Sequence, residues 1–193
     1  MRKERVKSEN KTTISENQEE FVMSESIFSR YSCRKFSEKP VTDEQLTTIT
    51  KAGMCAPTAR NERPWEFLII RSEEGRKKIA EASPYAESCL NAQAVIVALA
   101  DSRRISKDSP WWIQDMSACV ENMLIEITEL GLGGVWLGLY PRQERGKAIA
   151  EAFGLESELI PFAAVPVGYP DTKDIKKERF EPERIRWEQV KSE

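Results

Sequence analysis

The stretch 92–100 is nearly all apolar, and it constrains the fold more than any other segment of the chain. A short run of this kind, bounded by polar residues, is typical of a β-strand that is buried on both faces. Shorter strands are expected at 65–70, 135–139 and 162–168. A sheet with a doubly buried central strand needs helices on both of its faces, so the chain must supply several amphipathic helices.

Helices are expected between these strands, and several have a recognisable end signal. Thr42 and Gln45 form a capping box, and Pro57 ends the helix that follows. Ser109 and Pro110 begin the longest helix. The expected helices are a short one from residue 23, then 42–56, 73–82, 109–131 and 142–153.

The order of the elements favours an α+β domain built on a small mixed sheet flanked by helices. The glycine loops of nucleotide-binding folds, GxGxxG and GxxxxGK[ST], are missing from the sequence. A doubly wound dinucleotide-binding fold is therefore disfavoured, and any bound phosphate must be held by cationic side chains.

The chain divides into a short extension and one domain. Residues 1–22 are polar, mixed in charge and without apolar periodicity, so we expect a flexible N-terminal extension. The rest, 23–193, has the size of a single domain.

A net charge of −3 argues against general affinity for nucleic acid. Without a secretion signal or an apolar run of roughly 18 residues, we expect a cytoplasmic protein that does not span a membrane.

The sequence excludes several kinds of chemistry. It contains no histidine, which removes Ser-His-Asp and Cys-His catalysis and histidine metal sites. Its 4 cysteines are widely spaced without a CxxC pair, so no metal site is expected. We expect Cys33 and Cys55 to be buried thiols rather than redox groups. Gln114 and Asp115 are expected to be solvated at the start of the long helix, and a role in a substrate channel is the alternative.

Two segments favour a bound, phosphorylated, planar cofactor. Arg30, Ser32 and Arg34 occupy alternate positions, which in extended chain turns all three toward one anion. The second segment, 56–65, is a proline-punctuated loop whose amide, Asn61, and aromatic residue, Trp65, suit a flat polar ring. Each has an ordinary alternative: the arginines can be solvated or cap a helix, and the loop can simply join a helix to a strand.

Two later motifs add to this pattern. The stretch 132–138, LGGVWLG, joins the long helix to a strand, and Lys177-x-Arg179 lies near the C-terminus. Taken alone, the glycines fit a helix cap and a close contact, and the two cations fit solvated positions. In this order, however, the four motifs resemble the nitroreductase family of FMN enzymes over about 24–190.

The resemblance implies which residues bind the cofactor phosphate and its neighbours. It places Arg30, Ser32 and Arg34 beside FMN, at the phosphate, the ribityl chain and the pyrimidine edge. It also implies that Lys177 and Arg179 complete the phosphate site. An FMN phosphate carries nearly two negative charges, and several cations at close range would neutralise it.

The resemblance also implies which residues face the flavin ring. Pro57, Thr58 and Asn61 match the loop that the partner subunit brings to the ring. Leu137 and Gly138 match the end of a strand whose backbone amide faces the flavin N5. No side chain is expected to be catalytic, because the flavin N5 carries the chemistry.

The assembly that the resemblance implies is an intertwined homodimer in which the C-terminal tail of each subunit wraps around the partner. Phe180 and Trp187, apolar residues in a charged tail, fit such an arm. Hydride would come from NADH or NADPH, and nitroaromatics, quinones or similar acceptors would be reduced by a ping-pong mechanism. The alternatives are a dehalogenase-like or flavin-fragmenting relative on the same fold, a non-catalytic FMN-binding protein, or a module for anionic ligands or nucleic acid.

Overall fold

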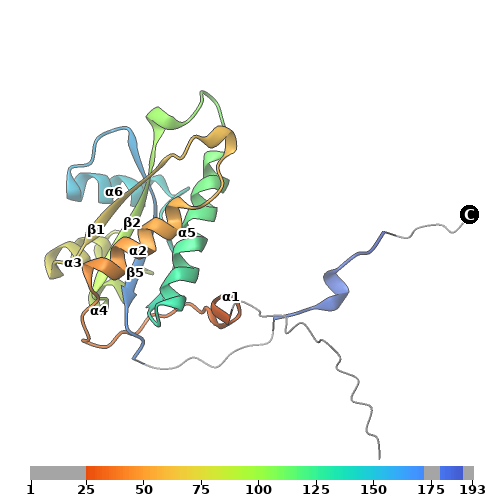
Figure 1. Cartoon of the computed structure of the whole chain (residues 1–193). Helices are drawn as coiled ribbons and strands as arrows, with labels where there is room; N and C mark the ends of the chain where they lie inside the picture. Colours follow the sequence, from red (N-terminus) through yellow and green to blue (C-terminus); the bar gives the residue numbers. More distant parts are fainter. Residues whose placement is uncertain (1–24, 172–178, 189–193) are drawn as a thin grey trace, which may run out of the picture.

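The computed structural model describes residues 25–171 and 179–188, and it is shown in Figure 1. The strands are β1 (Trp65–Ile70), β2 (Ala94–Asp101), β3 (Gly133–Gly134), β4 (Leu137–Gly138) and β5 (Leu159–Gly168). The helices are α1 (Glu25–Ser29), α2 (Asp43–Met54), α3 (Glu73–Glu81), α4 (Ser88–Asn91), α5 (Trp112–Glu129) and α6 (Gln143–Phe153). Short 3₁₀ turns lie at Ala59–Asn61, Ser102–Arg104 and Pro182–Arg184.

The strands form one sheet in the order β1-β2-β5-β3, with β4 also pairing with β5. Every residue of β2 is buried, as its apolar run predicts. The ladders between the described strands are all antiparallel, and the parallel pairing found among the described residues is the isolated bridge between Ser32 and Gly134, so the sheet is more antiparallel than the expected mixed sheet. Ile70 at the end of β1 pairs with Val95 near the start of β2. The intervening segment therefore begins and finishes at the same end of the sheet, although it contains α3 and α4.

Two layers of helices cover the sheet. The β2 side chains pack against both layers because they alternate between the two faces of the sheet. Ala94, Ile96 and Ala98 belong to the core under α2 and α5. Val95 and Val97 belong to the core under α3, α4 and α6. Figure 1 shows these two groups of helices on opposite sides of the sheet. Each buried Val or Ile side chain contributes about 1.5–3 kcal/mol to folding.

The predicted ends of two helices are confirmed. Thr42 caps α2 through a reciprocal box, in which its hydroxyl accepts the Gln45 N–H and the Gln45 side chain accepts the Thr42 N–H. Gly154 ends α6 in the left-handed region with φ of 61°, where glycine carries no steric penalty.

The single strand expected at 135–139 is wrong. The chain forms β3 and β4 instead, separated by Val135 and Trp136, although both pair with β5 in the same register. In that register the gap faces Pro166, which has no N–H to donate to a ladder. The interruption lets Trp136 leave the ladder and line a cavity.

The described part of the C-terminal tail carries two exposed aromatic residues. Phe180 and Trp187 are 67% and 84% exposed. Lys177 and the predicted extension 1–22 lie outside the described residues. Among the described helices, none is long and apolar enough to cross a bilayer.

Candidate functional site

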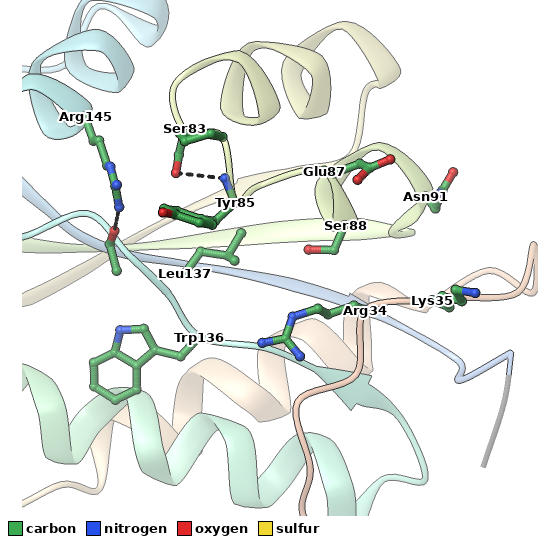
Figure 2. A pocket seen from close by; sticks show the side chains of 12 residues that line it. Arg34, Lys35, Ser83, Tyr85, Glu87, Ser88, Asn91, Trp136, Leu137 and Arg145 are labelled. Atoms are coloured by element: carbon green, nitrogen blue, oxygen red, sulfur yellow. Dashed lines mark hydrogen bonds between the residues drawn. The ribbon is translucent and has the colours of Figure 1, made fainter. Parts of the chain in front are cut away.

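A cavity of about 640 Å³ opens beside β4, between the α3–α4 connection and the first turn of α6 (Figure 2). Its volume lies in the range of about 300–1,000 Å³ that is common for small-molecule sites. The lining residues are Arg34, Lys35, Ser83, Pro84, Tyr85, Glu87, Ser88, Asn91, Trp136, Leu137, Gly138 and Arg145.

Arg34 reaches the cavity because its segment runs in extended form against the sheet. Ser32 forms a bridge with Gly134 and Phe36 forms one with Pro170, so the chain is held on both sides of Arg34. Cys33 and Phe36 point into the core, and the residues between them point outward. Ser32 and Arg34 are thus exposed on either side of the buried Cys33.

Leu137 and Gly138 form the cavity wall next to the sheet. Both pair with β5, Leu137 with Ala164 and Gly138 with Ala163. The Arg145 side chain donates to the Gly138 carbonyl oxygen at 3.2 Å, and its guanidinium lies 5.5 Å from the Tyr85 ring centroid. Figure 2 shows Arg145 descending from α6 toward this carbonyl. The strand end is therefore fixed by the sheet on one side and by α6 on the other.

Ser88 is the functional candidate that sequence reasoning missed. It is only 6% exposed, and its hydroxyl has no hydrogen-bond partner within the described part of the chain. A buried hydroxyl without a partner costs about 1–3 kcal/mol. Figure 2 shows the hydroxyl directed toward the space between Leu137 and Arg34. No local motif marks Ser88, because its burial follows from the packing of α4 on the sheet.

The charges and aromatic rings of the lining favour an anionic ligand with a flat part. The cations Arg34, Lys35 and Arg145 line the cavity with one carboxylate, Glu87. Trp136 supplies an aromatic face, and its ring packs 6.0 Å from that of Phe162 in the core. Trp136 is thus packed against the core on one side, and the rest of the cavity lining is largely polar.

The structure separates Arg30, Ser32 and Arg179 from this lining. Arg30 forms an ion pair with Glu121 of α5, with 3.3 Å between Nε and Oε1. Arg30 and Ser32 do not line the cavity. Arg179 is exposed and also lies outside the lining, and Lys177 is outside the described residues.

The loop after α2, residues 57–64, carries Pro57, Thr58 and Asn61, and none of them lines the cavity of the same chain. Its backbone is strained, since Arg60 and Asn61 have φ of 54° and 57°, values that non-glycine residues rarely adopt. We call residues 57–64 the α2–β1 loop.

Side chains from distant segments hold the α2–β1 loop at two points. The Asp115 carboxylate accepts the Ala59 N–H at 3.0 Å. The Glu62 carboxylate accepts both the hydroxyl and the backbone N–H of Ser106, and the Ser106 hydroxyl lowers the pKa of Glu62. The expectation that Asp115 is solvated is therefore wrong, because it is 6% exposed and bonded across the fold, whereas Gln114 is exposed as expected.

The two cysteines near the proposed site differ. Cys33 is buried, as expected, and its Sγ lies 3.3 Å from the Lys35 carbonyl oxygen. Cys55 is exposed, so the expectation of burial is wrong there. Its position at the C-cap of α2 turns it away from the core that receives Leu46 and Ile49.

Comparison with known proteins identifies the family. The model of the nitroreductase family matches residues 27–84 and 82–169. This chain belongs to the nitroreductase family. A protein of Archaeoglobus fulgidus, provisionally named an NADH dehydrogenase/NAD(P)H nitroreductase, is 43% identical over 162 residues, which cover 82% of this chain and 93% of the relative.

Solved structures agree with the assignment to the nitroreductase family. One from Clostridium acetobutylicum, provisionally named an NADH oxidase, is 40% identical with a TM-score of 0.81, over 86% of this chain and 99% of the other. A provisionally named nitroreductase from Desulfovibrio desulfuricans, solved in complex with FMN, is 27% identical with a TM-score of 0.77, over 86% and 96% of the two chains. The predicted family and its α+β fold are thereby confirmed.

Proposed function

We propose that the protein is a homodimeric, FMN-dependent oxidoreductase. It takes hydride from NADH or NADPH and reduces nitroaromatics, quinones or similar acceptors by a ping-pong mechanism. The enzyme class, an NAD(P)H-dependent oxidoreductase, agrees with the names of its relatives. The observation that carries the proposal is the cationic cavity beside β4 with its orphaned Ser88 hydroxyl.

The residues of the cavity fit FMN. Its cations suit a phosphate-bearing ligand, and the Trp136 and Tyr85 rings suit the flat isoalloxazine. The Ser88 hydroxyl and the Asn91 amide can pair with the polar edge of a heterocycle. When bound, FMN supplies reversible hydride transfer, which amino-acid side chains do not provide.

We assign binding roles to the residues that line the cavity. Arg34 neutralises negative charge, and Leu137 and Gly138 present a fixed strand end to the ring. Arg30 and Ser32 are proposed to extend this contact toward the phosphate, since the half-exposed Glu121 leaves Arg30 free to exchange partners. Lys177 and Arg179 are proposed to complete the phosphate site.

The remaining predicted contacts are proposed to cross a dimer interface. Pro57, Thr58 and Asn61 lie outside the cavity of their own chain. If these residues enter the cavity of a second copy, they can contact its FMN as predicted although they lie outside the cavity of their own chain. The exposed aromatic residues Phe180 and Trp187 support an arm that packs on the partner. The division into residues 1–22 and 23–193 and the cytoplasmic location stay predictions.

Purification and a visible spectrum test the proposal first. The protein should be yellow, release FMN on denaturation, and oxidise NADH or NADPH when a nitroaromatic or quinone is present. A protein that binds no added FMN would overturn the proposal. A yellow protein whose flavin neither nucleotide reduces would instead be a non-catalytic FMN-binding protein.

A matched pair of variants then tests the site. Arg34→Ala removes a cavity cation, whereas Lys51→Ala removes an exposed cation from the last turn of α2. FMN should dissociate much faster from the Arg34 variant and at the wild-type rate from the Lys51 variant. Equal retention of flavin by both would refute the assignment of Arg34.

A further inference from the structure

The α2–β1 loop holds a conformation that its own sequence does not favour. Three of its residues, Arg60, Asn61 and Arg63, have positive φ of 54°, 57° and 46°. Such residues persist only where surrounding structure fixes them. Within the loop, the Asn61 N–H donates to the Thr58 carbonyl oxygen at 3.2 Å, the Glu62 N–H to the Ala59 carbonyl oxygen at 3.1 Å and the Arg63 N–H to the Thr58 hydroxyl at 3.3 Å. An ion pair joins Arg60 and Glu62 at 3.6 Å.

Asp115 supplies support from outside the loop. Its Oδ1 accepts the Ala59 N–H at 3.0 Å, between two segments that are 56 residues apart in the chain. Its Oδ2 is buried and has no hydrogen-bond partner among the described residues. The carboxylate lies in the first turn of α5, where the helix dipole stabilises negative charge.

The arrangement is not what capping of α5 requires. The N-cap of α5 is Trp111, which makes no side-chain capping bond. The Asp115 carboxylate instead accepts a hydrogen bond from the backbone of the α2–β1 loop. The bonded residue, Ala59, directly follows Thr58 and lies two residues before Asn61, so this bond fixes the backbone of the short segment that carries both side chains.

We propose that Asp115 is a positioning residue that fixes Thr58 and Asn61 in the orientation in which they meet the flavin. The inference rests on the proposed function, since it takes these two residues as flavin contacts. Asp115 acts through the Ala59 N–H and does not touch the cofactor. Glu62 and Ser106 hold the far end of the loop, so without Asp115 the loop stays attached but its near half is released.

Two substitutions at Asp115 separate positioning from charge. Asp115→Ala removes the acceptor, whereas Asp115→Asn keeps a carbonyl oxygen that can accept the Ala59 N–H. Thr42→Ala serves as a control, because loss of the α2 cap lowers thermal stability without touching the loop. All three variants are compared with the full-length wild-type protein.

Limited digestion with trypsin reports on the loop without reference to flavin. Arg60 is exposed within it, and the bond after Arg63 resists trypsin because Pro64 follows. Cleavage after Arg60 should be about tenfold faster in Asp115→Ala, the effect of losing one buried hydrogen bond. Cleavage in Asp115→Asn and Thr42→Ala should stay near the wild-type rate.

FMN affinity and turnover complete the test. Asp115→Ala should bind FMN more weakly and turn over more slowly, and Asp115→Asn should restore both. Wild-type cleavage, affinity and turnover in Asp115→Ala would overturn the inference. Faster cleavage with unchanged FMN affinity would show that the loop does not meet the flavin. A wild-type protein without FMN binding is a different outcome: it would remove the proposed function, while the digestion would still report whether Asp115 orders the loop.

Discussion

The cavity beside β4 and the α2–β1 loop are built in opposite ways. The cavity walls are set by the sheet and by α4 and α6, and the Ser88 hydroxyl there has no partner. The loop is held from another part of the chain by one hydrogen bond to Asp115 and two hydrogen bonds from Ser106. The difference teaches that a cavity built on the sheet and its helices is shaped without a hydrogen bond from the buried Ser88 hydroxyl to any described residue, whereas the conformation of a strained loop depends on a few hydrogen bonds from outside it.

The largest effect is expected from reversing a charge in the cavity. Arg34→Glu places a carboxylate where the anionic cofactor is proposed to bind, so the Kd for FMN should rise by about 30-fold or more, equivalent to about 2 kcal/mol. Fluorescence titration of the apoprotein measures this. The same change at the exposed Lys51, Lys51→Glu, should leave the Kd unaltered. If both variants weaken FMN equally, long-range charge and not the cavity governs affinity.

Removing the Ser88 hydroxyl should move stability and affinity in opposite directions. Ser88→Ala deletes a buried group without a partner, so the free energy of unfolding should stay constant or rise by up to about 1 kcal/mol. FMN affinity should fall about tenfold, because the hydroxyl no longer pairs with the ligand. Urea unfolding of the apoprotein and a flavin titration measure the two. A clear loss of stability would mean that the hydroxyl serves the fold.

On the loop side, the bond between Ser106 and Glu62 should make stability depend on pH. The folded pKa of Glu62 is held below its ordinary value of 4.5, chiefly by the Ser106 hydroxyl. Its contribution is therefore complete above the ordinary pKa and is lost as pH falls through the lowered one. Between pH 6 and pH 3, the Tm of the wild type should fall more than that of Ser106→Ala. Parallel curves would show that this bond does not stabilise the loop.

The smallest effect concerns one thiol from each region. Cys89 lies beside Ser88 on the cavity side, and burial raises its pKa to about 12. Cys55 lies exposed just before the α2–β1 loop. With a thiol reagent at pH 8, Cys55 should react promptly and Cys89 only after unfolding, as peptide mapping can verify. Prompt labelling of Cys89 would indicate that the cavity side opens more readily than its burial suggests.

The parts of the fold that depend on local pattern were predictable. The apolar run of β2, the Thr42 capping box and Gly154 each specify their element through neighbouring residues. The antiparallel direction of the sheet was not predictable in this way. It depends on which end of the sheet each connection returns to. The break between β3 and β4 was not predictable either, because it depends on Pro166, which lies on a different strand.

The residues of the candidate site likewise divide into those that belong to local sequence motifs and those that are identified only by the folded structure. Arg34, Leu137 and Gly138 belong to short motifs, and the structure brings them to one cavity. Ser88 has no motif, since its burial arises from how α4 packs on the sheet. Asp115 was expected in solvent because its position in the first turn suggests it. Only the folded chain reveals that its partner is the Ala59 N–H.

The two bridges that flank Arg34 also bear on how the protein is made. The bridge at Ser32 cannot form until Gly134 has been synthesised, and the bridge at Phe36 cannot form until Pro170 has been synthesised. The apolar β2 likewise lacks its β5 neighbour until residues 159–168 have left the ribosome. Between the synthesis of Asp101 and that of Gly168, a nascent chain thus carries this apolar strand with one edge unpaired. Chaperone demand during synthesis should accordingly end only when the last strand emerges.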